Sequence, residues 1–199
     1  GLIIVVSAPS GAGKSTICRR LLAACPELEF SVSYTSRTPR PNEIGGKDYH
    51  FISRELFQRR IDEGEFVEWV ENYGQFYGTS VKAINDVLNR GKDLLLDIEP
   101  RGAKAIKTQF PDAVFVFVLP PSPDELLKRL KKRGHESQEA IKIRFAQANS
   151  ELKEVLWYNY TIFNEDLETA VLQMISIYRA EKCKTKRLRR KIDRVFKIE

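Results

Sequence analysis

The chain of 199 residues has few cysteines and no long hydrophobic run. Its three cysteines, Cys18, Cys25 and Cys183, lack the spacing of metal ligands, which is typical of a reduced, cytosolic protein. No apolar run approaches the roughly 20 residues of a membrane-spanning helix. The short apolar run at the N-terminus lacks the basic flank of a signal peptide. We therefore expect a cytoplasmic protein that does not associate with membranes.

The net charge of +6 is confined to one end of the chain. Residues 179–199 contain ten Lys/Arg and three Asp/Glu, so the remainder is almost neutral. We expect the segment Lys184–Arg194 to continue the last helix or to fray from it. A solvated helix end and weak contact with RNA or the ribosome both fit this segment, but it has no aromatic residues interleaved for base stacking. We expect no specific nucleic-acid partner, and the oligomeric state stays open, a homo-oligomer included.

Residues 8–16 carry the most informative pattern, Ala-Pro-Ser-Gly-Ala-Gly-Lys-Ser-Thr, between an apolar run and a helical pattern. This is the strand, glycine-rich turn and helix of a phosphate-binding loop, matched at every position except Ala8, where glycine is usual. Gly11 and Gly13 let backbone N–H groups point at phosphate oxygens. Lys14 can reach the β- and γ-phosphates, and the Ser15 hydroxyl can bind Mg²⁺. The loop predicts a nucleoside triphosphate as the first substrate.

Hydrophobic patterning predicts an α/β fold in one domain, with a mostly parallel sheet covered by helices on both faces. The expected strands are Leu2–Ser7, Phe30–Tyr34, Leu94–Ile98, Val114–Leu119 and Tyr160–Asn164. The expected helices are Lys14–Ala24, Arg54–Glu63, Val81–Arg90, Pro100–Gln109, Pro123–Arg133, Gln138–Val155 and Leu167–Arg179. Residues 31 to about 90 break the alternation and are rich in Gly, Pro, Tyr and Thr, which indicates an inserted lobe with its own small sheet.

A second anion site is indicated by Ser-Arg-Thr-Pro-Arg at residues 36–40. Two arginines three residues apart in a proline-constrained segment can converge on one phosphate, whose geometry suits planar guanidinium groups. Tyr49 and Tyr77 lie in the polar motifs Gly-Lys-Asp-Tyr and Tyr-Gly-Thr, and their hydroxyls could complete the site. A kinase needs a second phosphate site, whereas a simple NTPase does not.

Together these motifs, with Leu-Asp-Ile-Glu at 96–99, resemble the guanylate kinases, nucleoside monophosphate kinases of the P-loop class, from about Leu2 to about Arg179. The resemblance implies transfer of a phosphoryl group from ATP to GMP in purine metabolism, with Mg²⁺ as cofactor. It also implies a three-layer parallel sheet of the P-loop NTPase type with an inserted lobe and a helical lid. The implied parts are a core (1–32, 91–122 and 146–180), a GMP-binding lobe (33–90), a lid (123–145) and a basic tail (181–199).

The resemblance assigns two nucleotide sites. Glu68 suits guanine, because one carboxylate can accept hydrogen bonds from both N1–H and the 2-amino group, and adenine would leave it unpaired. The hydroxyls of Ser33 and Thr79 can donate to O6. The implied GMP-binding residues are Ser33, Arg37, Arg40, Tyr49, Glu68, Tyr77, Thr79, Asp97 and Glu99. The implied ATP-binding residues are Ser10, Gly11, Ala12, Gly13, Lys14, Ser15, Thr16 and Asn164.

Asp97 ends an apolar strand, where an acidic residue beside a phosphate loop commonly holds Mg²⁺ directly or through water. Ser15 and Asp97 are therefore the expected metal ligands. Glu99 stands where the family generally has Asp, and Pro100-Arg101 also departs from the usual pair before Gly102. These departures concern the details of the nucleoside pocket rather than the reaction.

Arginines of the lid suit phosphoryl transfer, because negative charge builds on the moving group. The expected catalytic residues are Lys14, Arg37, Arg129, Arg133 and Arg144. His135 is interpreted as a loop residue, and no general base is needed because the acceptor is already a phosphate anion. Asn164 is expected near adenine, at the N-cap of the next helix, or both.

Two alternatives remain. One is a nucleoside monophosphate kinase of other base specificity, which the set Ser33, Glu68 and Thr79 disfavours. The other is a non-catalytic module of the guanylate kinase type that binds proteins, which the intact Gly-Lys-Ser-Thr sequence disfavours.

Overall fold

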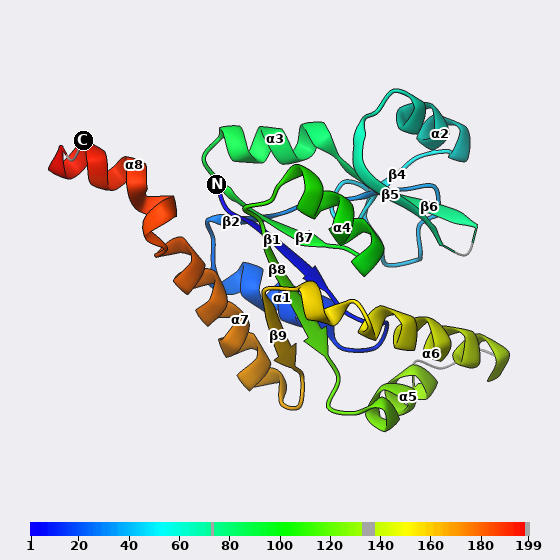
Figure 1. Cartoon of the computed structure of the whole chain (residues 1–199). Coiled ribbons are helices and arrows are strands. Elements are labelled where there is room, and N and C mark those ends of the chain that lie inside the picture. Colours follow the sequence, from blue (N-terminus) through cyan, green and yellow to red (C-terminus); the bar gives the residue numbers. More distant parts are fainter. Residues whose placement is uncertain (73, 133–137, 198–199) are drawn as a thin grey trace.

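The structure is a computed structural model that describes residues 1–72, 74–132 and 138–197. Five strands form a parallel sheet in the order β2-β7-β1-β8-β9 (Figure 1). Their bounds are Ile3–Ser7 for β1, Leu28–Phe30 for β2, Asp93–Asp97 for β7, Val114–Leu119 for β8 and Tyr160–Phe163 for β9.

Helices cover both faces of this sheet because its central strands β7, β1 and β8 contain unbroken apolar runs. In β1, Ile4 and Val6 pack with α1 (Lys14–Ala24) and α7 (Leu167–Lys182). Ile3 and Val5 point the other way and pack with α3 (Val81–Asn89) and α4 (Pro100–Gln109). Alternate residues of a strand face opposite sides, so an unbroken apolar run needs two covering layers. The predicted three-layer α/β architecture is confirmed.

A second sheet forms the predicted inserted lobe. Its order is β4-β3-β6-β5, and the helix α2 packs beside it (Figure 1). The three aromatic rings of its small core stack, with the Phe57 ring centroid 4.5 Å from that of Phe66 and 5.2 Å from that of Phe76. The bounds are Tyr34–Thr35 for β3, His50–Phe51 for β4, Arg54–Asp62 for α2, Phe66–Asn72 for β5 and Gln75–Ser80 for β6.

One prediction at the edge of this lobe is wrong. The expected strand Phe30–Tyr34 is two strands, because β2 pairs with β7 of the large sheet and β3 pairs with β6 of the small one. The helix α3 follows β6, and its apolar residues Ile84 and Val87 pack in the core on the large sheet.

The helices α5 (Pro123–Lys132) and α6 (Gln138–Leu152) form a separate small unit around Leu126, Leu130 and Ala148. The boundary drawn at residue 145 therefore falls inside one continuous helix. α6 was expected to reach Val155, but it ends at Leu152 and a short 3-10 helix follows over Val155–Trp157.

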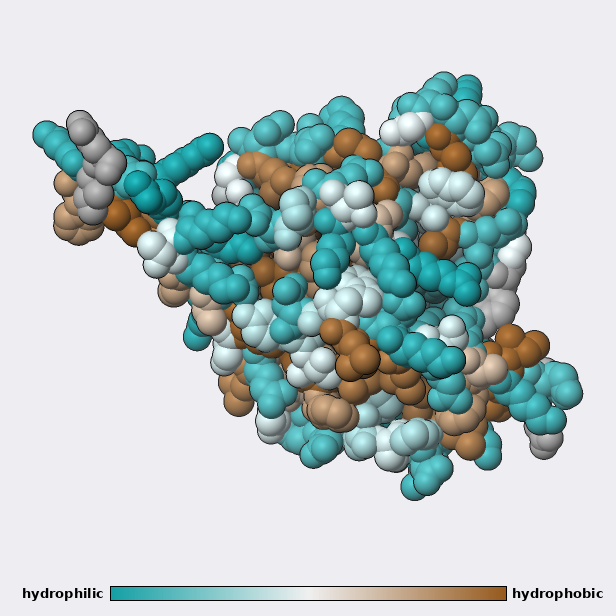
Figure 2. Space-filling view, in the orientation of Figure 1, coloured by the Kyte–Doolittle hydropathy of each residue, from teal (hydrophilic) through white to brown (hydrophobic). Residues whose placement is uncertain are grey.

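The C-terminal region contains one helix more than expected. α7 continues to Lys182 rather than Arg179, and a separate helix α8 spans Thr185–Phe196. The chain leaves the helical conformation at Lys184, which has ψ of 128°. α8 projects from the body, and Figure 2 shows its surface as mostly hydrophilic with an apolar side. In the part of the chain that the structure describes, no helix is long and apolar enough to cross a membrane.

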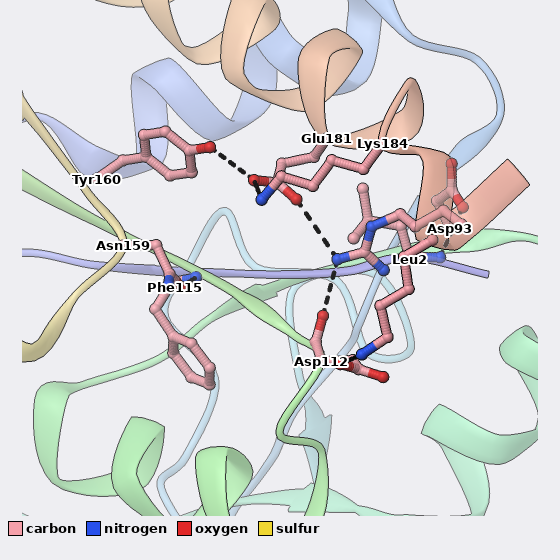
Figure 3. A network of polar contacts seen from close by, with 10 residues as sticks. Leu2, Asp93, Asp112, Phe115, Asn159, Tyr160, Glu181 and Lys184 are labelled. Atoms are coloured by element: carbon pink, nitrogen blue, oxygen red, sulfur yellow. Dashed lines mark hydrogen bonds and ion pairs between the residues drawn. The ribbon is translucent and has the colours of Figure 1, made fainter.

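Polar residues at the amino ends of the strands tie these C-terminal helices to the sheet (Figure 3). The buried carboxylate of Asp93 accepts hydrogen bonds from the Leu2 amide (2.7 Å) and the Tyr178 hydroxyl (2.6 Å) and pairs with Lys182 (2.7 Å). Burial alone would raise the pKa of Asp93, but hydrogen bonds from Lys182 and Tyr178 outweigh it and leave the pKa below its usual value. We call the residues Leu2, Asp93, Tyr160, Tyr178, Glu181, Lys182, Lys184 and Arg187 the amino-end network.

Glu181 is the second carboxylate of the amino-end network. It is 1% exposed, accepts a hydrogen bond from the Tyr160 hydroxyl (2.6 Å) and pairs with Lys184 (2.7 Å) and Arg187 (3.5 Å). Its pKa is also lowered, because these partners outweigh the effect of burial. Arg187 donates onward to the Asp112 carbonyl (2.8 Å), which fixes the first turn of α8 against the body.

Candidate active site

The phosphate loop follows β1 and leads directly into α1. Gly11 and Gly13 both have φ of +96°, a conformation that side chains disfavour, so glycine is required at both positions. A Cβ on Gly13 would also overlap the amide nitrogen of Asn164. That amide donates to the Ala12 carbonyl (2.7 Å), so the residue that follows β9 holds the loop in addition to its own ends. Backbone N–H groups at the start of an eleven-residue helix make an anion site.

Lys14 projects from this loop onto the end of β7. Its ammonium group pairs with the Asp97 carboxylate and lies 3.4 Å from the Ile98 carbonyl oxygen. Burial lowers the pKa of Lys14, but the charge and hydrogen bond of Asp97 outweigh it, so the pKa lies above its usual value. The lysine therefore stays charged, and it has a partner that a phosphate group can replace.

A cavity of about 360 Å³ lies where the large sheet, the lobe and α6 meet. The phosphate loop forms one end, the lobe strands β5 and β6 form the other, and α6 contributes a side. This arrangement places two chemically different ends in one cavity. Its predicted site residues are Ser10, Gly11, Gly13, Lys14, Ser15, Ser33, Arg40, Tyr49, Glu68, Tyr77, Asp97, Glu99 and Arg144.

Glu68 is the buried acid of the lobe end. It is 7% exposed and accepts a hydrogen bond from the Thr79 hydroxyl (2.6 Å) on the paired strand β6. Its carboxylate lies against Gly102 of α4, where a Cβ would overlap it. Burial raises its pKa to about 7, against the opposing hydrogen bond from Thr79 and with a further contribution from the charge of Glu99. Thr79 was expected to donate to a base, but its hydroxyl already donates to Glu68.

The two arginines of residues 36–40 are organised by Glu43, which the sequence analysis missed. The Glu43 carboxylate accepts two hydrogen bonds from the Arg37 guanidinium (2.8 and 2.9 Å) and one from the Arg40 backbone amide (2.8 Å). These bonds, above all those from Arg37, hold the pKa of Glu43 below its usual value. Tyr49 and Tyr77 meet edge to face, with ring centroids 6.0 Å apart, and both line the cavity.

The helices α5 and α6 place the lid arginines differently. Arg129 donates to Glu125 (3.0 Å) and to the Asn164 carbonyl (3.4 Å). It therefore lies beside Asn164, the residue whose side chain holds the phosphate loop. Arg144 lines the cavity on the same face of α6 as Gln147, Ala148 and Glu151. Burial above all, and then the charge of Glu99, raises the pKa of Glu151 to about 7. Arg133 and His135 lie outside the described residues.

Asn164 corrects one expectation. It is buried and supports the phosphate loop, whereas the N-cap of α7 is Asp166, whose carboxylate accepts from the Thr169 amide (2.8 Å). The other predicted residues that the structure describes do not line the cavity, and they are Ala12, Thr16, Arg37, Thr79 and Arg129.

Several residues that line the cavity or organise its arginines were not predicted. Glu151 follows Arg144 by seven residues and Gln147 by four, so helical spacing could have placed it on this face. Asn72 follows Glu68 by four residues on a strand, which puts both side chains on one face. Glu43 had no such periodic signal, because it lies in an irregular loop.

Comparison with known proteins gives a consistent result. The family model for guanylate kinase matches residues 2–181. A guanylate kinase of Syntrophus aciditrophicus is 50% identical over 199 residues, covering 100% of this chain and 96% of the relative. One of Symbiobacterium thermophilum is 50% identical over 187 residues, covering 94% and 89%.

Solved structures agree with this result. The crystal structure of guanylate kinase from Anaplasma phagocytophilum has a TM-score of 0.79 at 35% identity and covers 100% of this chain and 97% of its own. A shikimate kinase of Bacteroides thetaiotaomicron, with a TM-score of 0.51 at 15% identity and coverage of 89% and 98%, shares the fold alone. The family model covers most of the chain and the relatives match along nearly their whole length, so this chain belongs to the guanylate kinase family.

Proposed function

We propose that the protein transfers the γ-phosphoryl group of ATP to GMP, giving ADP and GDP. One observation carries this proposal: the phosphate loop and the buried carboxylate of Glu68 line the same cavity. A phosphate loop alone would suit any NTPase, and a buried acid alone would suit many ligands. Together they provide a triphosphate site and a site for a hydrogen-bond donor such as guanine.

At the ATP end, backbone N–H groups of residues 10–16 receive the phosphates. Lys14 exchanges its Asp97 partner for the β- and γ-phosphates as ATP enters, while Asn164 keeps the loop in shape from behind. Because the loop geometry is already formed, little reorganisation is needed when the triphosphate binds.

Mg²⁺ fits this end of the cavity. Ser15 and Asp97 offer hydroxyl and carboxylate oxygens, the ligand type that Mg²⁺ prefers, and both line the cavity. Among the described residues no cluster of three His, Cys, Asp or Glu could hold a metal, which agrees with an ion held mainly by phosphates and water. When bound, Mg²⁺ neutralises charge on the phosphates, and Asp97 holds it directly or through water.

At the GMP end, Arg37, Arg40, Tyr49 and Tyr77 receive the phosphate. Glu68 accepts hydrogen bonds from guanine N1–H and the 2-amino group, and Thr79 holds the carboxylate in place rather than contacting the base itself. Ser33 lines the cavity on the same side and donates to O6. Adenine has an acceptor at N1 and would leave Glu68 buried without its donors, which disfavours AMP by up to ~10⁴-fold.

Transfer then depends on positioning and charge. A GMP phosphate oxygen attacks the γ-phosphorus and ADP leaves, so no proton has to be removed first. Arg144 lies on the wall of the cavity, and Arg129 and Arg133 complete the set of lid arginines that stabilise the charge of the transferred group.

The deciding experiment measures ADP release by a coupled assay with ATP and Mg²⁺ and, separately, GMP, AMP, UMP, CMP and TMP. Turnover with GMP alone is the expected result. Turnover with another monophosphate would contradict the assignment of Glu68 to guanine. Folded protein that binds GMP but turns over none of the five would favour a non-catalytic, protein-binding module.

The cellular setting follows from the sequence rather than the site. We propose a cytosolic location, because Cys18, Cys25 and Cys183 are all free thiols. ATP and GMP are the partners that this function requires.

A further inference from the structure

Asn72 makes a contact across the cavity that joins the lobe to the core. Its side-chain amide donates a hydrogen bond of 2.8 Å to the carboxylate of Glu99. Asn72 is the last residue of β5, and Glu99 precedes α4 on the core side. Both residues are half-buried and both line the cavity.

The strand geometry places this contact beside Glu68. Glu68, Val70 and Asn72 alternate along β5, so all three side chains point to one face, and all three line the cavity. Glu99 faces them from the loop that follows β7. Its charge contributes to the raised pKa of Glu68, so the two carboxylates are close enough to influence each other.

Guanine has one donor at this edge that points away from Glu68, because the two hydrogens of the 2-amino group point in different directions. N1–H and one hydrogen of the 2-amino group satisfy Glu68, and the second amino hydrogen still needs an acceptor. A glutamate has three side-chain torsions and would lose considerable freedom in reaching it. Glu99 therefore gains from a fixed partner. The neutral amide of Asn72 provides one without offsetting the negative charge of Glu99, as an arginine or lysine would.

We propose that Asn72 is a positioning residue that holds the Glu99 carboxylate to accept a hydrogen bond from the 2-amino group of guanine. This inference rests on the proposed function, because it concerns selectivity for GMP. An ionised carboxylate can accept several hydrogen bonds, so Glu99 serves Asn72 and the nucleotide together. Asn72 then acts on selectivity without touching the reacting atoms.

The test compares GMP with IMP, which is the same nucleotide without the 2-amino group. We expect Asn72→Ala to lower kcat/KM for GMP about tenfold, the size of one hydrogen bond to a charged group. The kcat/KM for IMP should stay within about twofold, so the GMP-to-IMP ratio falls. Glu99→Gln should lower the same ratio, and the double variant should be no worse than Glu99→Gln alone, because both changes remove one interaction.

Asn85→Ala is the matched control, since Asn85 is an exposed asparagine on α3. An equal loss with GMP and IMP, or an unchanged ratio in folded Asn72→Ala protein, would overturn the inference. Additive losses in the double variant would overturn it too, because Asn72 would then act independently of Glu99. Failure of the proposed function looks different: the unaltered protein would turn over no GMP at all.

Discussion

The two ends of the parallel sheet treat buried acids in opposite ways. In the amino-end network, Asp93 and Glu181 each receive three donors from the chain, and the pKa of each lies below its usual value. At the cavity, the pKa values of the buried Glu68 and the half-buried Glu151 are each raised to about 7.

This difference separates a structural role from a binding role. A fully satisfied buried acid holds its partners in the fold, and removing one of those partners would be destabilising because it would leave an uncompensated buried charge. An under-satisfied one costs stability, and it keeps hydrogen-bonding capacity for a ligand. The acids whose ionised forms are disfavoured by burial therefore lie at the cavity, where the N–H donors of a bound nucleotide would stabilise them.

The largest effect should come from removing the lysine of the cavity end. Lys14→Ala is expected to lower turnover about 1000-fold, because the β- and γ-phosphates lose their charged donor. GMP binding should change by less than about threefold, since the lobe is untouched. ADP release and calorimetric titration with GMP measure the two quantities. Lys82→Ala, at an exposed ion pair on α3, is the control, and turnover within tenfold of the unaltered protein would contradict the assigned role.

Removing a buried acid from the amino-end network should lower the stability of the fold and leave turnover almost unchanged. Asp93→Asn is expected to lower the free energy of unfolding by about 3 kcal/mol, because three donors lose their buried, charged acceptor. The kcat/KM for GMP should stay within about twofold. Urea denaturation measures the first quantity, with Asp86→Asn on the exposed face of α3 as control. A loss of stability below about 1 kcal/mol would mean that the amino-end network contributes little.

The two ends should also respond oppositely to pH. Because the pKa of Glu68 is about 7 in the folded protein and near 4.5 ordinarily, the folded state binds more protons between these values. Stability should therefore fall as pH rises from about 4.5 to about 7, by up to about 3 kcal/mol. The lowered pKa of Asp93 works the other way: its contribution is lost as pH falls below about 3.8.

Urea denaturation at pH 5 and pH 8 tests the contribution of Glu68. Glu68→Gln should match the unaltered protein at pH 5 and be more stable than it at pH 8, where the native carboxylate is charged. Glu71→Gln, on the exposed face of the same strand, should leave the pH dependence unchanged. An identical pH dependence in Glu68→Gln protein would show that this carboxylate is not under electrostatic stress.

Local patterns predicted most of the fold. The bounds of α1, α4 and β8 match the expected ranges Lys14–Ala24, Pro100–Gln109 and Val114–Leu119 residue for residue. Each of these elements has a recognisable apolar pattern and a boundary marked by a specific residue, such as the proline at the start of α4. The phosphate loop was recognisable for the same reason, since its glycines and lysine are adjacent in sequence.

Contacts between distant segments could not be predicted in this way. Asn164 donates to the Ala12 carbonyl across 152 positions, and no local pattern distinguishes that role from a helix cap. The split of residues 30–34 between two sheets depends on which strand each half pairs with, which is also a long-range property. The roles proposed for Glu43 and Asn72 likewise depend on hydrogen-bond partners that no local sequence pattern identifies.

Glu43 provides the smallest expected effect and tests whether a carboxylate can aid an anion site. We expect Glu43→Gln to raise the KM for GMP about tenfold, with kcat and the KM for ATP within about threefold. The reason is that glutamine cannot accept from both guanidinium nitrogens of Arg37 and from the Arg40 amide. Steady-state kinetics with each substrate varied in turn measures these constants, and Glu63→Gln at the exposed end of α2 is the control.

The sign of this effect separates two explanations. If Glu43 acted only through its charge, removing it would relieve repulsion of the GMP phosphate, and the KM for GMP would fall. If it holds Arg37 and the Arg40 backbone in place, the loss of that order outweighs the relief, and the KM rises. A lowered KM would therefore contradict the holding role. A raised KM would show that a carboxylate whose hydrogen bonds all come from the chain can also serve ligand binding, because Glu43 would act by holding the arginines that bind the GMP phosphate.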